Sequence, residues 1–380
     1  MNFNFRKFIV TTFLTILLLA ITIDLPAPII VYGSQIVLIF LLIIIRFLLY
    51  PKFNIKNLLF GILVILFIEF LAIYQITYLK YTEIFWLNTH RTLVWIVSAI
   101  FLYDYFKNRG INYLIAPLNM VILVHALTIF AQIISYYILG SELDYSVILG
   151  GESVRSLFSL NDINYRPTGL TAEPSIYSGF MTGLLCLKYI INKRIDVFFL
   201  LGISSILGTF STLGIMIAFI ILTLIYIKNM KNILIGVLIV SSISSLFIDS
   251  VKARIELFML GDDGSNNVKI EILQSFFSNE NIKLFGYGFI GKSSTAPTFY
   301  EGLYDLTLYL NIFIYWGIIF GSLALIILVF LLFKSKYSVK EKILIMVTFI
   351  KLSGPTLIFF SFFVSLLLAI HNYRRRLNKI

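Results

Sequence analysis

Two arginines and a glutamate stand out in a chain that carries few charges. Arg155, Arg166 and Glu173 fall in one polar stretch, residues 140–173, and residues 166–175 read RPTGLTAEPS. Arginine suits phosphate groups because its planar guanidinium donates two parallel hydrogen bonds. These residue types indicate a site where two arginines and a carboxylate meet an anionic ligand at the membrane surface.

Glu173 has a second interpretation. Pro174 suits the first turn of a helix, where its missing N–H costs nothing. Glu173 would then lie at the helix N-terminus, where negative charge is favoured. In this interpretation Glu173 is only a helix cap and Arg166 is its surface partner. The sequence leaves both interpretations open.

A second polar stretch covers residues 250–305. Two parts of it, about 251–260 and 268–278, have apolar residues at helical spacing, so we expect amphipathic helices that lie on a bilayer or cover a cavity. Between them, residues 261–267 read GDDGSNN, which is typical of a polar turn.

A glycine-rich segment follows, with the sequence LFGYGFIGK over residues 284–292. Its Gly-x-Gly-x-x-Gly spacing matches a dinucleotide fingerprint, but no strand precedes it, and that fingerprint requires a βαβ unit. We interpret the segment as a glycine-rich hairpin or loop tip, with Lys292 available to an anion.

A few polar residues interrupt the apolar runs. Glu69 and His125 fall inside such runs, and Lys351 lies at a break between the last two. An ionised side chain at mid-bilayer costs about 2.5–3.5 kcal/mol, so each is a functional candidate. For His125 we favour a neutral imidazole that is hydrogen-bonded to a neighbouring helix. His90 and Arg91 are expected to start the fourth span at the outer surface.

The composition places most of the chain in lipid. Of 380 residues, 59% are hydrophobic and 13% are charged, whereas soluble proteins have about 45–50% and about 25%. A soluble enzyme, a nucleic-acid-binding domain and a disordered chain are excluded. Cys186 is the single cysteine and allows no intramolecular disulfide. The three histidines are scattered, so we expect no metal and no cofactor.

Apolar runs predict an all-α polytopic membrane protein with about 12 transmembrane helices, some of them short or broken. The runs lie near 8–23, 28–45, 57–77, 91–106, 111–139, 174–190, 195–209, 212–227, 233–249, 306–333, 343–352 and 355–370. No repeat and no separable soluble domain is visible. We therefore expect a single integral membrane domain over residues 1–380.

The basic residues predict the orientation. With the N-terminus in the cytoplasm, the inside loops comprise 53 residues and hold 20 of the 30 Lys and Arg residues. This distribution satisfies the positive-inside rule and places both termini in the cytoplasm. The two long loops, 140–173 and 250–305, then face outward and form the expected active-site region.

The pattern resembles the Wzy-type O-antigen and capsular polysaccharide polymerases, whose superfamily includes the O-antigen ligases. The residues that carry the resemblance are Arg166, Gly169, Glu173 and Pro174 before a span, Ser211 and Gly214 in a short span, Phe285-Gly286-Tyr287-Gly288, Tyr304-Asp305, and Gly317 with Gly321. An Arg-x10-Gly motif of some members is absent, because Arg166 stands at that distance from Arg155. The ligases tend to have a histidine in the late outer loop, and 250–305 has none, which favours a polymerase.

The resemblance implies a GT-C-like fold and a metal-independent, inverting glycosyl transfer. Undecaprenyl-diphosphate-linked repeat units would be polymerised into O-antigen or capsular polysaccharide at the outer face of the bacterial cytoplasmic (inner) membrane. The acceptor hydroxyl attacks the anomeric carbon, and the lipid diphosphate leaves with its charge stabilised by arginines. Glu173 is the expected general base, with Glu152 and Asp162 in reserve.

The resemblance and the charges together define the expected site. The catalytic residues are Glu173, Arg166 and Arg155, and the substrate-binding residues are Arg91, His90, Arg254, Lys269, Lys292, Tyr287, Gly288 and Lys351. The expected partners are the lipid-linked donor and acceptor glycans and membrane lipids, without nucleic acid. Whether a chain-length regulator protein also binds stays open.

Two other functions remain as alternatives. An O-antigen ligase would share the lipid-linked donor. A polysaccharide flippase or other transporter would be expected to show internal repeats, short loops on both sides and polar residues near the midplane. The two long outer loops and the lack of a repeat favour the polymerase.

Overall fold

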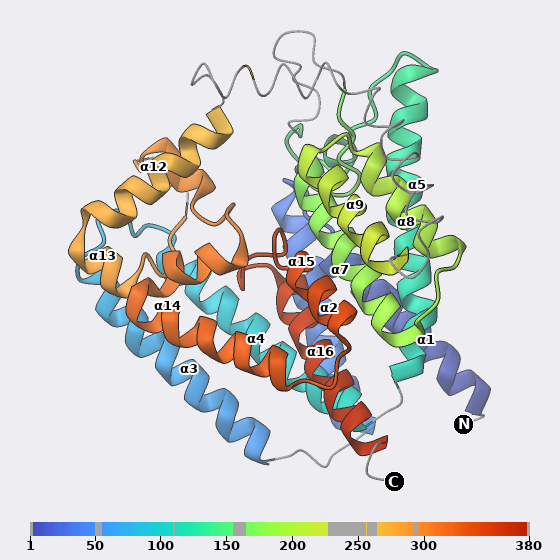
Figure 1. The fold of residues 1–380 in the computed structure, drawn as a ribbon, viewed down its shortest axis with the longest axis horizontal. Coiled ribbons are helices and arrows are strands. Elements are labelled where there is room, and N and C mark those ends of the chain that lie inside the picture. The colour runs from blue at the N-terminus through green and yellow to red at the C-terminus, as the bar shows by residue number, and fades with distance from the viewer. Residues whose placement is uncertain are drawn as a thin grey trace. The chain divides into compact units, whose positions relative to one another are not determined.

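A computed structural model describes residues 3–49, 55–108, 111–154, 165–226, 256, 264–291, 293 and 295–377 (Figure 1). Over these residues the chain is helical and forms no β-strand, apart from one isolated bridge between Asp24 and Thr171. The expected all-α class is therefore confirmed for the described part. The ninth predicted span, 233–249, and the amphipathic stretch 251–260, apart from residue 256, lie outside it.

The chain divides into two compact units, each built from separate stretches of sequence. The first unit contains residues 1–45, 110–253 and 339–348. Its helices are α1 (Phe3–Ile21), most of α2 (Pro28–Leu49), α5 (Ile115–Tyr137), α6 (Tyr145–Ile148), α7 (Pro174–Asn192), α8 (Val197–Gly208), α9 (Thr212–Tyr226) and α15 (Val339–Thr348), with a 3-10 turn, η1 (Ile111–Leu114).

Helix α7 is the central helix of the first unit and packs against α5, α8, α9 and α15. Leu184, Leu185 and Leu187 are completely buried on it. Even Lys188 is buried, where its Nζ donates to Asp196 Oδ2 at 2.7 Å. Because the start of α7 follows residues 165–173, the core of this unit holds the end of that segment in place.

The second unit contains residues 46–109, 254–338 and 349–380. Its helices are α3 (Ile55–Ile76), α4 (Phe85–Asn108), α12 (Gly264–Ser278), α13 (Glu280–Phe285), α14 (Leu308–Lys334) and α16 (Ile358–Leu377), with a 3-10 turn, η3 (Thr298–Gly302). Helix α4 packs against α3 and α16, α13 packs against α14, and α12 packs against η3.

Among the residues that the structure describes, three helices are long and apolar enough to cross a membrane, namely α3, α5 and α14. Large apolar side chains such as Leu63 and Phe70 on α3 and Ile326 on α14 are more than half exposed. Exposed apolar faces of this size mark contact with a membrane or a partner, so these helices are suited to lipid. The finer prediction of about 12 spans stays a prediction.

Several boundaries differ from the sequence prediction. The predicted span 343–352 is shorter and lies earlier, because α15 ends at Thr348 after 10 residues. Such a helix is about 15 Å long, half of the roughly 30 Å hydrocarbon core. The expected turn at 261–267 is wrong from Gly264 onward, because those residues begin α12. Val268 and Ile272 of this helix pack in the core of the second unit.

Candidate functional site

A buried glutamine of α5 fixes the segment 165–173 in the first unit. Gln132 Oε1 accepts hydrogen bonds from the backbone N–H of Thr168 at 3.0 Å and of Gly169 at 2.8 Å. Its Nε2 donates to the carbonyl of Leu143 at 3.0 Å. Gly169 has a φ of +58°, a left-handed conformation that favours glycine. The backbone before α7 is therefore held rigidly.

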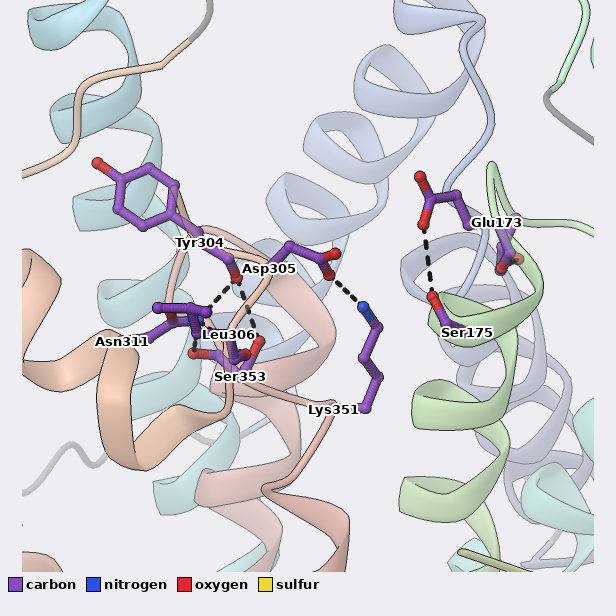
Figure 2. A network of polar contacts seen from close by, with 9 residues as sticks. Glu173, Ser175, Tyr304, Asp305, Leu306, Asn311, Lys351 and Ser353 are labelled. Atoms are coloured by element: carbon purple, nitrogen blue, oxygen red, sulfur yellow. Dashed lines mark hydrogen bonds and ion pairs between the residues drawn. The ribbon is translucent and has the colours of Figure 1, made fainter. Parts of the chain in front are cut away.

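Glu173 lies at the start of α7 but does not act as a side-chain cap. Its backbone is extended, with φ −142° and ψ 147°, and its carboxylate accepts no capping hydrogen bond from the helix. Ser175 Oγ donates to Glu173 Oε2 at 3.4 Å (Figure 2). Pro174 occupies the first turn as predicted. Glu173 therefore lacks the side-chain hydrogen bond of a cap, while its pairing with Arg166 stays a prediction.

The backbone of Glu173 is held independently of its carboxylate. The hydroxyl of Thr171 donates to the carbonyls of Thr168 at 2.8 Å and of Glu173 at 2.9 Å. The carboxylate is half-buried at the N-terminus of α7. The positive end of the helix dipole there favours a negative charge. This carboxylate can accept a proton from a hydroxyl placed within hydrogen-bond reach.

Arg166 lies on the same segment, seven residues before Glu173, and is half-buried. Its neighbour Tyr165 stacks on Tyr136 of α5, with ring centroids 4.2 Å apart and planes 10° apart. Burial, followed by the charges of Glu142 and Asp144, raises the pKa of Tyr165. The surroundings of this tyrosine are therefore acidic as well as partly buried, and a cation such as Arg166 suits them.

The acidic residues nearby have separate roles. The Asp144 carboxylate accepts from the backbone N–H of Ser146 at 2.8 Å and of Val154 at 3.1 Å, so it caps the short helix α6. Glu152 is exposed after that helix. Arg155 and Asp162, expected as a second arginine and a reserve base, lie outside the described residues.

The glycine-rich segment of the second unit fills a break in α14. Gly317 has φ +67° inside that helix and interrupts it. The backbone N–H groups of Tyr287 and Gly288 donate to the carbonyls of Ile314 at 2.7 Å and Tyr315 at 3.0 Å. These carbonyls lie directly before the break, so the segment satisfies acceptors that a continuous helix would have satisfied.

A second buried glutamine fixes this arrangement. Gln75 Nε2, on α3, donates to the carbonyl of Phe285 at 2.7 Å and to that of Tyr315 at 2.9 Å. Tyr287 is completely buried, and its hydroxyl is 2.5 Å from Ser275 Oγ. The segment is therefore not a hairpin tip at a surface. Substrate contact by Tyr287 and Gly288 stays a prediction.

The other predicted binding residues of the second unit form two groups, His90 with Arg91 in one and Lys351 in the other. His90 and Arg91 lie inside α4, which begins six residues earlier than predicted, at Phe85. His90 stacks on Trp86 and its Nε2 lies 3.5 Å from Glu69 Oε1 of α3. These contacts explain why the helix continues through polar positions that resembled a boundary.

Lys351 pairs with Asp305 in the second group (Figure 2). Beside this ion pair, Asn311 Nδ2 donates to the carbonyl of Tyr304 at 2.7 Å and to that of Ser353 at 3.1 Å. The Tyr304 ring stacks on Tyr315, with centroids 4.3 Å apart. Arg91 interacts electrostatically with Tyr315. Arg91 and Lys351 therefore both belong to the surroundings of the Tyr304–Tyr315 pair.

The remaining candidates are less informative. Lys269 is half-buried on α12, and Arg254 and Lys292 lie outside the described residues. Among the residues that the structure describes, no group of three His, Cys, Asp or Glu side chains could hold a metal ion. The predicted hydrogen bond of His125 to a neighbouring helix is made at the end of α1, because its Nε2 lies 2.8 Å from Oγ1 of Thr22, the residue directly after that helix.

No protein-family model matches the chain, and neither does any curated protein or solved structure. The geometry therefore carries the functional argument alone.

Sequence reasoning missed Gln75 and Gln132, the two side chains that fix the polar segments. Both are uncharged amides inside apolar runs, and a buried amide needs hydrogen-bond partners, which is the signal that identifies such residues.

Proposed function

We propose that the protein is a membrane glycosyltransferase that polymerises undecaprenyl-diphosphate-linked oligosaccharide units into O-antigen or capsular polysaccharide. The observation that carries the proposal is the segment 165–173. It presents Arg166 and Glu173 on a backbone that Gln132 holds, and the Glu173 carboxylate is not used to cap α7. A cation and a carboxylate on one rigid segment suit a reaction with an anionic leaving group and a hydroxyl nucleophile.

The proposed reaction assigns one role to each side chain. The acceptor hydroxyl of one lipid-linked unit attacks the anomeric carbon of the donor glycan while the bond to the lipid diphosphate breaks. Glu173 takes the hydroxyl proton, and Arg166 stabilises the negative charge that develops on the diphosphate. One displacement inverts the anomeric configuration. Arg155 is the proposed second cation for the diphosphate.

The proposed orientation places this segment outside. Basic residues concentrate in the loops that would then be cytoplasmic, including Arg374, Arg375 and Arg376 near the C-terminus. The proposed location is the bacterial cytoplasmic membrane. An active site on its outer face has no access to nucleotide sugars, so a lipid-linked donor is the chemistry that fits.

A transporter is the second candidate, because the break at Gly317 in a candidate span is typical of helices that line transport sites. The surroundings of the break weaken this alternative. The carbonyls of Ile314 and Tyr315 are bonded to protein groups, whereas a transport site would leave such groups to a substrate or ion.

The products that accumulate distinguish the two functions. In cells whose own copy is deleted, we expect single lipid-linked repeat units that react with an impermeant periodate reagent added from outside. Wild-type protein should restore polymer, and Arg166→Lys should restore little, because lysine keeps the charge but loses the two parallel hydrogen bonds. Units that stay protected from the reagent would identify a flippase and contradict the polymerase.

A further inference from the structure

A glutamate and a histidine form a pair on an exposed face of the second unit. Glu69 Oε1 on α3 lies 3.5 Å from His90 Nε2 on α4, and the two side chains are 28% and 62% exposed. The two helices pack against each other (Figure 1). The His90 ring also stacks on Trp86, one turn earlier on α4, which fixes its orientation. The pair is therefore held in place by its own unit and still presents surface outward.

The depth of this pair makes its exposure unusual. Helix α3 is a candidate span, and Glu69 lies seven residues before its end at Ile76. The glutamate is therefore about 10 Å from that end and about 5 Å from the middle of the helix. Every other residue from Gly61 to Ala72 is apolar or glycine. In a membrane that α3 spans, the pair lies inside the hydrocarbon layer, where ionisable side chains almost always face other protein groups or water.

Exposed apolar side chains border the pair in a regular pattern. Each of the two residues has a large apolar residue three positions before it and another four positions after it, on the same helix face. These four residues are between 43% and 68% exposed, and they are Leu66, Ile73, Leu87 and Val94. Because α3 and α4 run in opposite directions, Ile73 and Leu87 lie at one depth on one side of the pair. Leu66 and Val94 lie at one depth on its other side, and each match is within about 2 Å along the helix axes.

This face is complementary to itself. The contact uses one oxygen of a carboxylate that has two, and one nitrogen of an imidazole that has two. A twofold axis perpendicular to the membrane keeps a second copy at the same depth, and a twofold interface is reciprocal. Glu69 of each copy can therefore contact His90 of the other while it keeps its own. The acyl chains of lipids offer no hydrogen-bonding group to either side chain, so a second copy fits this face better than lipid does.

We propose that this face of α3 and α4 is the interface between two copies of the chain in the membrane. Two Glu69–His90 pairs join at the twofold axis, and the four apolar side chains of each copy enclose them. Hydrogen bonds between helices and close packing are the forces that associate helices in lipid. The interface is independent of the proposed reaction, because it depends only on the position of α3 in a membrane and on the contacts of these two helices.

An exchange of the two side chains tests the contact between copies. Two full-length variants, His90→Glu and Glu69→His, are labelled with different fluorophores and reconstituted together in liposomes at high dilution. One variant carries two carboxylates and the other two imidazoles, so only a mixed dimer restores every Glu–His contact. Single-molecule colocalisation should show mixed dimers in excess of either like dimer by at least about tenfold. Random association of the two variants would contradict the proposal.

A single substitution and a matched control measure the strength of the interface. Photobleaching steps of the wild-type protein in liposomes, counted over a range of protein-to-lipid ratios, give the dissociation constant of the dimer. Glu69→Leu should raise this constant at least about tenfold, because both equivalent contacts between the copies are lost. Glu280→Leu removes the carboxylate of an exposed pair with Lys283 on α13 and should leave the constant unchanged. Equal constants for the two variants would contradict the proposal.

Cysteine cross-linking tests the same face without any change to the pair. Ile73→Cys in one copy and Leu87→Cys in the other should form a disulfide upon oxidation, and both positions are exposed enough for the variants to fold. Leu310→Cys, near the start of α14 and also exposed, replaces Ile73→Cys as the control. The native Cys186 is buried in all of these proteins. Cross-linking no greater than in the control, or wild-type protein that stays monomeric at every protein-to-lipid ratio, would overturn the proposal and leave this face to lipid or to a different protein.

Discussion

The two polar segments of the molecule are built in parallel ways and use their polar groups differently. In each, a buried glutamine from a candidate span bonds to two backbone groups of the segment or its surroundings. Gln132 accepts from two N–H groups of segment 165–173, whereas Gln75 donates to two carbonyls at the break of α14. In segment 165–173 the Glu173 carboxylate makes no capping hydrogen bond to α7. In the glycine-rich segment the backbone N–H groups of Tyr287 and Gly288 are bonded to carbonyls of α14.

This difference separates positions that support the fold from positions that can do chemistry. Tyr287 and Gly288 complete the hydrogen bonds of α14, and Tyr287 has no exposed surface. Arg166 and Glu173 are both half-buried, on a backbone fixed by other residues. A glycine-rich sequence before a span is therefore ambiguous until its backbone partners are known.

The largest expected effect follows from substituting Gly317, the glycine at the break in α14. A Cβ on Gly317 would lie 2.2 Å from the carbonyl carbon of Leu284, and φ +67° is strained for alanine. Backbone atoms cannot move aside, so Gly317→Ala should abolish folded protein, measured by size-exclusion chromatography in detergent. Gly33→Ala is the control, since no atom lies within 4 Å, and it should change stability by no more than about 1 kcal/mol. Normal folding of Gly317→Ala would show that the break is not required.

A smaller effect distinguishes the two glutamines. Gln75→Glu removes the amide group that donates to the carbonyls of Phe285 and Tyr315 and puts a carboxylate oxygen in its place. Because this oxygen repels the two carbonyls, the substitution should lower the unfolding free energy by several kcal/mol. Gln132→Glu keeps both acceptor bonds to Thr168 and Gly169 and loses one donor bond, to Leu143. It should cost about 1–3 kcal/mol. Thermal unfolding in the same detergent measures both, and equal losses would contradict the assignment of donors and acceptors.

The smallest effect is expected at the surface next to the glycine-rich segment. Lys283 Nζ lies 3.4 Å from Glu280 Oε1 in an exposed pair on α13. Exposed pairs of this kind contribute less than about 1 kcal/mol. Lys283→Ala should therefore leave the melting temperature nearly unchanged. A large decrease would show that the charge at this position, and not only the backbone, supports the segment.

The sequence predicted the parts that depend on local patterns. Apolar runs predicted the helical class and most helix positions. Pro174 predicted the start of α7, because proline is tolerated in the first turn of a helix and not in its interior. The start of α4 was misplaced because His90 and Arg91 resemble a boundary. Contacts of His90 with Trp86 and Glu69 keep those positions helical.

The break at Gly317 and the role of the glycine-rich segment could not be predicted from local patterns. The carbonyls freed at the break find their partners about thirty residues away in the chain, at Tyr287 and Gly288. Only the folded structure brings those residues together. For the same reason, the sequence left Glu173 as either a cap or a catalytic group, since a cap is identified by a hydrogen bond and not by a residue type.

The most direct test of the central claim compares Glu173→Gln with Tyr287→Phe. The measurement is polymer length on a gel, at equal amounts of folded protein, with the melting temperature determined in parallel. Glu173→Gln should keep the melting temperature, since an anion at a helix start contributes about 0.3–1 kcal/mol. The amount of polymer that it makes should fall about 10²–10⁴-fold, because an amide cannot take the proton of the acceptor hydroxyl.

Tyr287→Phe should show the opposite pattern. It loses the hydrogen bond to Ser275, so the unfolding free energy should fall by about 1 kcal/mol while the folded fraction makes polymer of normal length. Wild-type polymer from Glu173→Gln, or loss of polymer from well-folded Tyr287→Phe, would contradict the assignment of chemistry to segment 165–173 and of support to the glycine-rich segment.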